Sequence, residues 1–128
     1  MKYGVNTWIW TAPLTIAELE EIAPKVAKMG CDHIEIPIDD PKTLDFKKLA
    51  EVVTNAGIKS ISFCAAMSPD RDLIDPDPNV RKNGADYLKA CIDGLAIVGG
   101  TNLVGPFYSA VGRCWQQTAE EREHDMVI

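Results

Sequence analysis

The stretch that decides the fold is KMGCDHIEIPI, residues 28–38, in which one helix ends and one strand begins. Gly30 is a typical C-terminal stop for a helix. After it, apolar and polar residues alternate, as they do along a strand that buries one face. The apolar face would hold Ile34, Ile36 and Ile38, and the other face His33, Glu35 and Pro37. We therefore expect a strand over residues 33–38 with helices against its apolar face.

On both sides of this strand, predicted strands and helices alternate along the chain. Further strands are expected over residues 3–10, 59–66 and 102–107, and each is followed by a segment with helical periodicity. Thr15 and Thr118 each precede a glutamate by three residues, the spacing of a helix-initiating capping box. Asp77 stands before Pro78 as the expected cap of the third helix. The order βαβαβαβα predicts a parallel sheet with right-handed crossovers.

The two faces of the predicted strands differ in polarity. On the third strand Ile61 and Phe63 oppose a face of small and polar residues that includes Ser62. A doubly wound open sheet would need apolar residues on both faces, whereas a small, polar face fits the interior of a barrel. A TIM (β/α)8 barrel takes about 250 residues and eight units. We therefore expect α/β architecture: the N-terminal half, four βα units, of a TIM barrel, as one partial domain over residues 1–128 that stops within its fourth helix.

Composition excludes several classes of protein. Thirteen basic and nineteen acidic residues give a net charge of −6, which counts against nucleic-acid binding. No apolar run approaches the roughly 20 residues that cross a bilayer, and the N-terminus lacks a signal-peptide cleavage site. The four cysteines form no CxxC pair and are expected to be free thiols. These features predict a cytoplasmic protein that binds neither nucleic acid nor membrane.

Few residues at the carboxyl ends of the predicted strands could carry chemistry. Glu35 lies on the interior face, where a carboxylate needs a cationic partner, a metal or a substrate. Asn6 could bind a substrate hydroxyl or simply satisfy a polar core, and Cys64 could be a packing residue or a pocket wall. Trp8 and Trp10, at the end of the first predicted strand, could stack on a sugar or fill space. The residues predict a polar pocket without a complete catalytic set.

The other titratable residues are expected to have structural roles. His33 begins its strand and would lie at the face of the barrel that serves stability, and His124 is expected to be solvated. The aspartates of residues 70–77 lack the glycine spacing of a calcium loop and read as turn and cap residues.

Four segments together resemble a known group of proteins. They are MKYGVNTWIW (1–10), KMGCDHIEIPI (28–38), DPDPNVRKNGADYLKACIDGLAIVGG (75–100) and GPFYSAVGR (105–113), the last followed by Trp115. In order and spacing they are similar to the xylose-isomerase-like barrels of the sugar phosphate isomerase/epimerase superfamily. Within it the similarity is greatest to the D-tagatose 3-epimerase and D-psicose 3-epimerase group.

The resemblance implies a metal-dependent barrel that interconverts free ketohexoses at C3. One glutamate would remove the C3 proton and a second would return a proton to the opposite face of an enediolate. A divalent ion, Mn²⁺ or else Mg²⁺ or Co²⁺, would chelate the substrate oxygens. The two glutamates, an aspartate and a histidine that do this belong to the second half of the family's barrel. The resemblance therefore assigns no catalytic residue and no metal ligand to this chain, which alone should be inert.

What the resemblance does assign here is the wall of the sugar pocket. The substrate-binding positions it implies are Asn6, Leu14, Glu35, Cys64 and Val104. Asn6 departs from the family pattern, since relatives often have an aromatic residue there. Val111 departs too, because some relatives place a tryptophan over the substrate at that position. The implied partner is a free ketose, and we expect a homo-oligomer.

Two alternatives stay open at this point. The chemistry could be another reaction of the superfamily, such as hydroxypyruvate isomerisation or inosose dehydration. The chain could also be a non-catalytic half-barrel that pairs with itself or with another half to cover the edges of its first and last strands.

Overall fold

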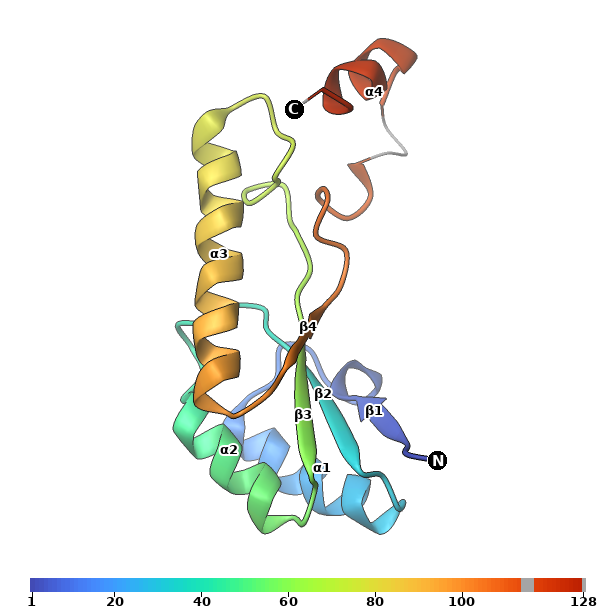
Figure 1. Ribbon diagram of the computed structural model, residues 1–128, viewed down its shortest axis with the longest axis vertical. Helices are drawn as coiled ribbons and strands as arrows, with labels where there is room; N and C mark the ends of the chain where they lie inside the picture. Colours follow the sequence, from blue (N-terminus) through green and yellow to red (C-terminus); the bar gives the residue numbers. More distant parts are fainter. Residues whose placement is uncertain (114–116, 128) are drawn as a thin grey trace.

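The computed structural model describes residues 1–113 and 117–127 and contains one parallel sheet in the order β1-β2-β3-β4 (Figure 1). The strands are β1 (Gly4–Asn6), β2 (His33–Pro37), β3 (Ser60–Cys64) and β4 (Asn102–Val104). The helices are α1 (Ile16–Lys28), α2 (Phe46–Asn55), α3 (Pro78–Ile97) and α4 (Ala119–Asp125), and a short 3-10 helix, η1 (Thr7–Ile9), follows β1. The alternation of strands and helices confirms the predicted βα order.

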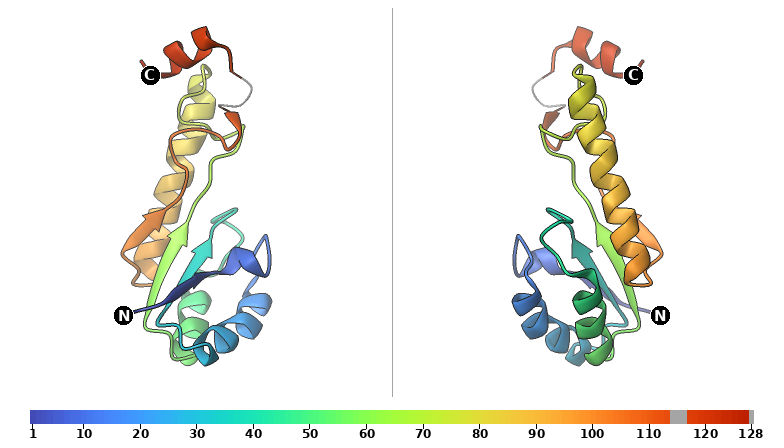
Figure 2. Two further views of the ribbon diagram at one scale, coloured as in Figure 1. Left: turned by 90° about the vertical axis from the view of Figure 1, so that its right-hand side faces the viewer. Right: turned by 90° about the vertical axis from the view of Figure 1, so that its left-hand side faces the viewer.

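The helices α1, α2 and α3 pack against one face of the sheet, while α4 lies at the far end of the molecule from β1 (Figures 1 and 2). Between these helices and the strands lies a single apolar cluster. Its fully buried side chains include Ile34, Ile36, Phe63, Leu19 and Leu49. The opposite face of the sheet carries no helix from the described ranges (Figure 2). This one-sided cover confirms an arc of a barrel rather than a doubly wound open sheet.

The helix starts agree with the predicted caps. Both Thr15 and Thr118 form complete capping boxes, in which the threonine hydroxyl accepts from the N–H three residues on and the glutamate there accepts from the threonine N–H. The Asp77 carboxylate accepts from the Asn79 N–H at the start of α3. These local hydrogen bonds fix where each helix begins.

All four predicted strands were longer than the observed ones, and the difference is greatest at the first, followed by the third and the last. A strand was expected over residues 3–10, but β1 ends at Asn6 because its side-chain oxygen accepts a hydrogen bond from the Trp8 N–H and starts η1. Trp8 therefore lies within η1 and Trp10 directly after it, each about two-fifths exposed. A strand was also expected over residues 102–107, but β4 ends at Val104. Gly105 follows with a φ of 135°, which ends the extended backbone.

Gly105 also lies very close to the end of β3. A Cβ atom at this position would be 1.9 Å from the Ala65 carbonyl oxygen. The close approach accompanies a hydrogen bond of 2.8 Å from the Ala65 N–H to the Val104 carbonyl oxygen. Glycine at residue 105 thus lets the chain after β4 cross directly over the end of β3.

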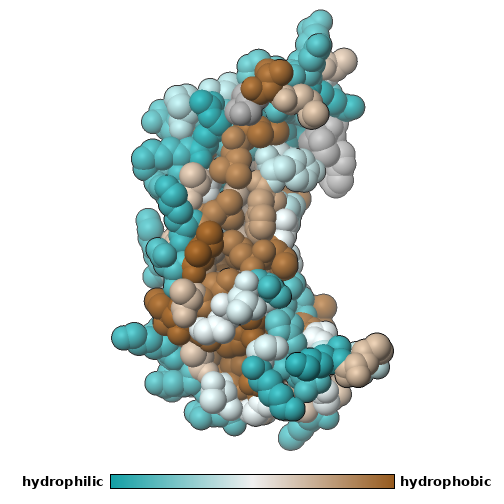
Figure 3. All heavy atoms as spheres, in the orientation of Figure 1, coloured by the Kyte–Doolittle hydropathy of each residue, from teal (hydrophilic) through white to brown (hydrophobic). Residues whose placement is uncertain are grey.

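Apolar side chains form a band along the face seen in Figure 3, over the segments that follow β3 and β4. Exposed apolar residues of the segment after β4 include Tyr108 and Val111. Among the described helices none is long and apolar enough to span a membrane.

Candidate functional site

The open face of the sheet arranges its residues in three layers, set by the register of the parallel strands. The layer at the amino ends of the strands contains Gly4, His33 and Ser60. The middle layer contains Asn6, Glu35, Ser62 and Asn102. The layer at the carboxyl ends contains Pro37, Cys64 and Val104. Polar groups are therefore concentrated in the first two layers and give way to a small apolar rim.

Glu35 is the centre of the middle layer. Its Oε1 accepts a hydrogen bond of 2.7 Å from Asn6 Nδ2, and its Oε2 accepts one of 3.3 Å from Ser62 Oγ. In the described part of the chain an amide and a hydroxyl satisfy this carboxylate, rather than the Lys or Arg considered from sequence. The arrangement satisfies an inward-facing charge while leaving it part-exposed on the open face.

Asn6 has a fixed amide orientation. Its oxygen accepts from the Trp8 N–H at 2.8 Å while its nitrogen donates to Glu35. The two bonds distinguish the oxygen from the nitrogen, because a backbone N–H can only donate and a carboxylate only accepts. The side chain therefore presents a defined polar surface toward the cavity on this face.

That cavity is small and lies on β1 and β2. It measures about 240 Å³ and is lined by Gly4, Val5, Asn6, His33 and Glu35. His33, which the sequence placed among the structural residues, thus lies beside both inward-facing candidates. Alternation along β2 already placed His33 on the same face as Glu35, whereas its pairing with Ser60 in the neighbouring strand depends on the register between strands, for which the sequence carries no signal.

Cys64 lies at the carboxyl end of β3 and is 6% exposed. Burial, followed by the nearby Glu35 charge, raises the pKa of the Cys64 thiol, and a hydrogen bond with Asn6 opposes this shift only in part. The thiol is therefore protonated near neutral pH. It suits a pocket wall better than a nucleophile.

The two remaining positions that the resemblance implied, Val104 and Leu14, lie in different surroundings. Val104 is paired with Cys64 and is 39% exposed at the end of β4. Leu14, in contrast, is only 5% exposed and belongs to the apolar cluster under the helices. The structure therefore brings Asn6, Glu35, Cys64 and Val104 onto one face, with Leu14 in the core.

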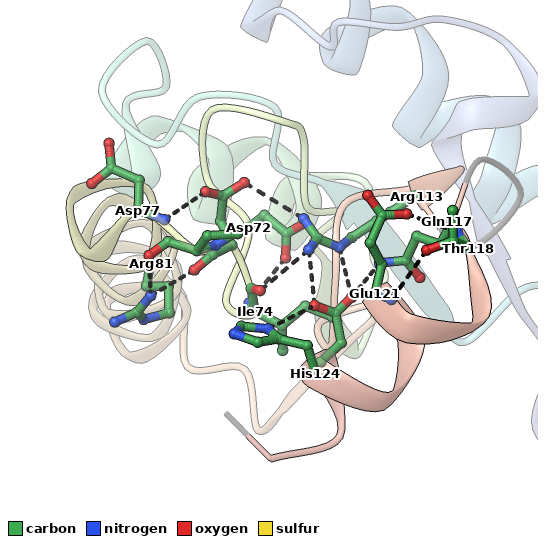
Figure 4. A network of polar contacts seen from close by, with 12 residues as sticks. Asp72, Ile74, Asp77, Arg81, Arg113, Gln117, Thr118, Glu121 and His124 are labelled. Carbon is green, nitrogen blue, oxygen red and sulfur yellow. Dashed lines mark hydrogen bonds and ion pairs between the residues drawn. The ribbon is translucent and has the colours of Figure 1, made fainter.

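A second polar cluster joins α4 to the loop that follows β3, and its centre is Arg113 (Figure 4). Arg113 forms ion pairs of 3.1 Å with Asp72, 3.5 Å with Asp75 and 2.9 Å with Asp125. Asp72 is 1% exposed and also accepts from the Ile74 N–H. Asp72 is thus a buried ion-pair partner as well as the turn residue that was expected.

The cluster borders a larger cavity of about 980 Å³ between the loop after β3, residues 110–113 and α4. Gln117, which lies just before α4, also donates a hydrogen bond to Asp125. His124 is 59% exposed, which fits the solvated position expected for it. Predictions that involve Cys114 and Trp115 fall outside the described residues.

Acid is expected to weaken the attachment of α4. Hydrogen bonds from Arg113 hold the pKa of the Asp125 carboxyl below its ordinary value. Because the folded value is the lower one, Asp125 stabilises the fold above about pH 4, and this contribution is lost as the pH falls through the folded value. Carboxyl-carbon NMR should show Asp125 titrating at lower pH than an exposed aspartate. Arg113→Met should move that titration to higher pH, and an unchanged titration would contradict the assignment.

A divalent ion would need several ligand side chains close together. Among the described residues no group of three or more His, Cys, Asp or Glu side chains is arranged to hold an ion. The candidate face offers one carboxylate, Glu35, whose two oxygens already accept hydrogen bonds. In the described ranges these side chains therefore do not fit a divalent ion.

Comparisons with known proteins show which proteins this chain resembles. No family model matches the chain. The chain is 29% identical over 111 residues to a ketose 3-epimerase of Arthrobacter globiformis, covering 87% of this chain and 38% of that protein. It is 25% identical over 113 residues to an L-ribulose 3-epimerase of a Methylomonas species, covering 88% of this chain and 39% of that protein.

Solved structures agree on the fold. A D-allulose 3-epimerase of a Methylomonas species, in complex with D-allulose, superposes with a TM-score of 0.86 at 23% identity, over 99% of this chain and 44% of that one. A D-psicose 3-epimerase, in the presence of D-fructose, gives 0.79 at 18% identity over 99% of this chain and 44% of that one. The fold is thus four consecutive units of a TIM barrel.

The chain is a homologue of the ketose 3-epimerases, the family of the D-psicose and L-ribulose 3-epimerases. It spans 38% and 39% of the length of the two sequence relatives described above.

Proposed function

We propose that this chain forms the substrate-facing wall of a ketose 3-epimerase. The observation that carries the proposal is the row Asn6–Glu35–Ser62, which lies on the uncovered face of four βα units. The sequence similarity to ketose 3-epimerases over 87% of the chain supports the same assignment. The proton-transferring acids and the divalent ion, for which Mn²⁺ stays the prediction, would belong to residues beyond this segment.

The chemistry of the wall suits a polyhydroxylated ligand. The Asn6 amide offers a fixed donor and acceptor, and the neutral Cys64 thiol and Val104 form a small rim beside it. Directional hydrogen bonds of this kind orient a sugar relative to a reacting carbon. On this proposal the chain binds and orients the ketose but transfers no proton itself. A cytosolic location and a homo-oligomer likewise remain predictions.

The test uses both this chain and the protein encoded when the reading frame is followed past residue 128. The longer product should carry two glutamates, an aspartate and a histidine at later strand ends. It should interconvert D-allulose and D-fructose, or epimerise L-ribulose, when Mn²⁺ is supplied. The 128-residue chain should show no turnover under the same conditions.

A control variant and a contrasting substrate sharpen the result. Asn6→Ala in the longer protein should raise KM for the ketose, whereas Glu51→Gln on the exposed side of α2 should leave it unchanged. Turnover of hydroxypyruvate or an inosose without any ketose epimerisation would overturn the proposal in favour of another reaction of the superfamily.

A further inference from the structure

A continuous chain of hydrogen bonds crosses the open face from the amino ends of the strands to Asn6. His33 Nδ1 lies 2.8 Å from Ser60 Oγ, and His33 Nε2 lies 2.8 Å from Ser62 Oγ. Ser62 then reaches Glu35, and Glu35 reaches Asn6. His33 is the one member whose two nitrogens can exchange donor and acceptor roles.

The ring of His33 sits where β1 has no side chain. A Cβ on Gly4 would lie 2.8 Å from His33 Cδ2 and 2.9 Å from His33 Cβ. The imidazole therefore lies flush against the β1 backbone with both nitrogens directed at hydroxyls of β3. Packing fixes the position of the ring. The hydrogen bonds then determine which of its two nitrogens carries the proton.

The Glu35 carboxylate determines which atoms donate and which accept along this series of hydrogen bonds. Its Oε2 needs a donor, and the hydrogen bond it receives there comes from the Ser62 hydroxyl. A hydroxyl has only one hydrogen, so when Ser62 donates to Glu35 it must accept from His33 Nε2. Nε2 then carries the proton, and Nδ1 accepts from Ser60.

The reverse direction leaves a charge unsatisfied. If Nδ1 carried the proton, Ser60 would donate instead to the Asp32 carbonyl oxygen, 3.4 Å away, and Ser62 would donate to Nε2. The Asp32 oxygen already accepts from the Lys59 N–H at 3.1 Å, whereas Glu35 Oε2 would lose its hydroxyl donor. Because hydrogen bonds to a carboxylate are about twice as strong as neutral ones, the first direction is favoured.

We propose that His33 is a positioning residue which, as its neutral Nε2–H tautomer, acts through Ser62 to hold Glu35 and Asn6 in place on the substrate-facing wall. The proposal rests on the proposed function for the role of that wall. The direction of the hydrogen bonds follows from the contacts alone.

The structure also predicts a substitution that would reverse the direction of these hydrogen bonds. In Glu35→Gln, the side-chain oxygen must face Asn6 Nδ2, because the Asn6 amide cannot turn without losing its bond from the Trp8 N–H. The new NH₂ group then faces Ser62 and donates to it. Ser62 turns its hydrogen to His33 Nε2, and the proton of the ring moves to Nδ1.

Nitrogen-15 NMR of the ring reads this proton directly in the 128-residue protein. The spectra are recorded near pH 8, where a free imidazole is neutral. The wild-type protein should show a protonated Nε2 and an unprotonated Nδ1 at His33. Glu35→Gln should exchange the two signals, and a wild-type ring protonated at Nδ1, or at both nitrogens, would overturn the proposal.

The chain offers matched controls. The only other histidine, His124, lies on exposed α4, so its signals should be the same in every variant. Glu51→Gln, an exposed change of the same kind, should leave the His33 tautomer unaltered. Should Glu35→Gln not fold, Ser62→Ala serves instead. It should abolish the excess of the Nε2–H form, and persistence of that form would contradict the role of Ser62.

This experiment separates the proposal from the proposed function. The tautomer is read without sugar or metal, so its reversal does not depend on epimerase activity. If the longer protein did not turn over a ketose but His33 showed the expected tautomer, only the assignment of the substrate would be contradicted. Ketose turnover together with the wrong tautomer would remove the role of His33 only.

Discussion

Arg113→Met is expected to lower the free energy of unfolding by about 3 kcal/mol, because removing one partner of a buried ion pair leaves an uncompensated charge. That charge is Asp72, which is 1% exposed and pairs with Arg113 at 3.1 Å. Asp125, 9% exposed, would lose its guanidinium as well. Urea unfolding followed by circular dichroism measures the change.

An exposed ion pair provides the matched control. Lys82 and Asp86 pair on the surface of α3 with side chains 72% and 52% exposed. Lys82→Met should therefore cost no more than about 0.5 kcal/mol. Equal losses in the two variants would show that burial of Asp72 is not what makes the Arg113 cluster stabilising.

Gly105→Ala is the second change for which a large loss is expected, about 3 kcal/mol or more. The backbone of Gly105 has a φ of 135°, and the added carbon would lie 1.9 Å from the Ala65 oxygen. Left-handed backbone costs an ordinary residue about 1–2 kcal/mol, and overpacking adds about 1–3 kcal/mol. Thermal and urea unfolding should both report the loss.

A second glycine allows the cost of the backbone conformation to be measured apart from the cost of the steric clash. Gly57, after α2, has a φ of 82°, but a Cβ there would meet nothing within 4 Å. Gly57→Ala should thus show only the backbone cost of about 1–2 kcal/mol. If Gly105→Ala were no worse than Gly57→Ala, the close crossing over Ala65 would be without energetic consequence.

Local signals predicted most of the fold. The threonine–glutamate pairs at Thr15 and Thr118 and the Asp77–Pro78 cap lie within a few residues of the helix starts they determine, so sequence spacing suffices. The length of the first strand could not be found this way. The apolar run continues through Trp10, while a single side-chain bond from Asn6 ends the strand.

The candidate site was only partly predictable for a different reason. Alternation along each strand placed Asn6, Glu35 and Cys64 on one face, as β-structure requires. The partners of His33 depend on register between strands, and Arg113 meets Asp72 across a separation of 41 residues. Neither relation leaves a pattern in the one-dimensional sequence.

The sequential strand order has a consequence for how the fold comes apart. Within the sheet β1 pairs with β2 alone and β4 with β3 alone, through three residue pairs each, whereas β2 and β3 share five. Backbone protection against deuterium should therefore be greatest in the middle pair and decline toward both flanks, as in a stack where each layer touches only its neighbours. A substitution that unfolds β1 or β4 should therefore leave the pairing of β2 with β3 intact.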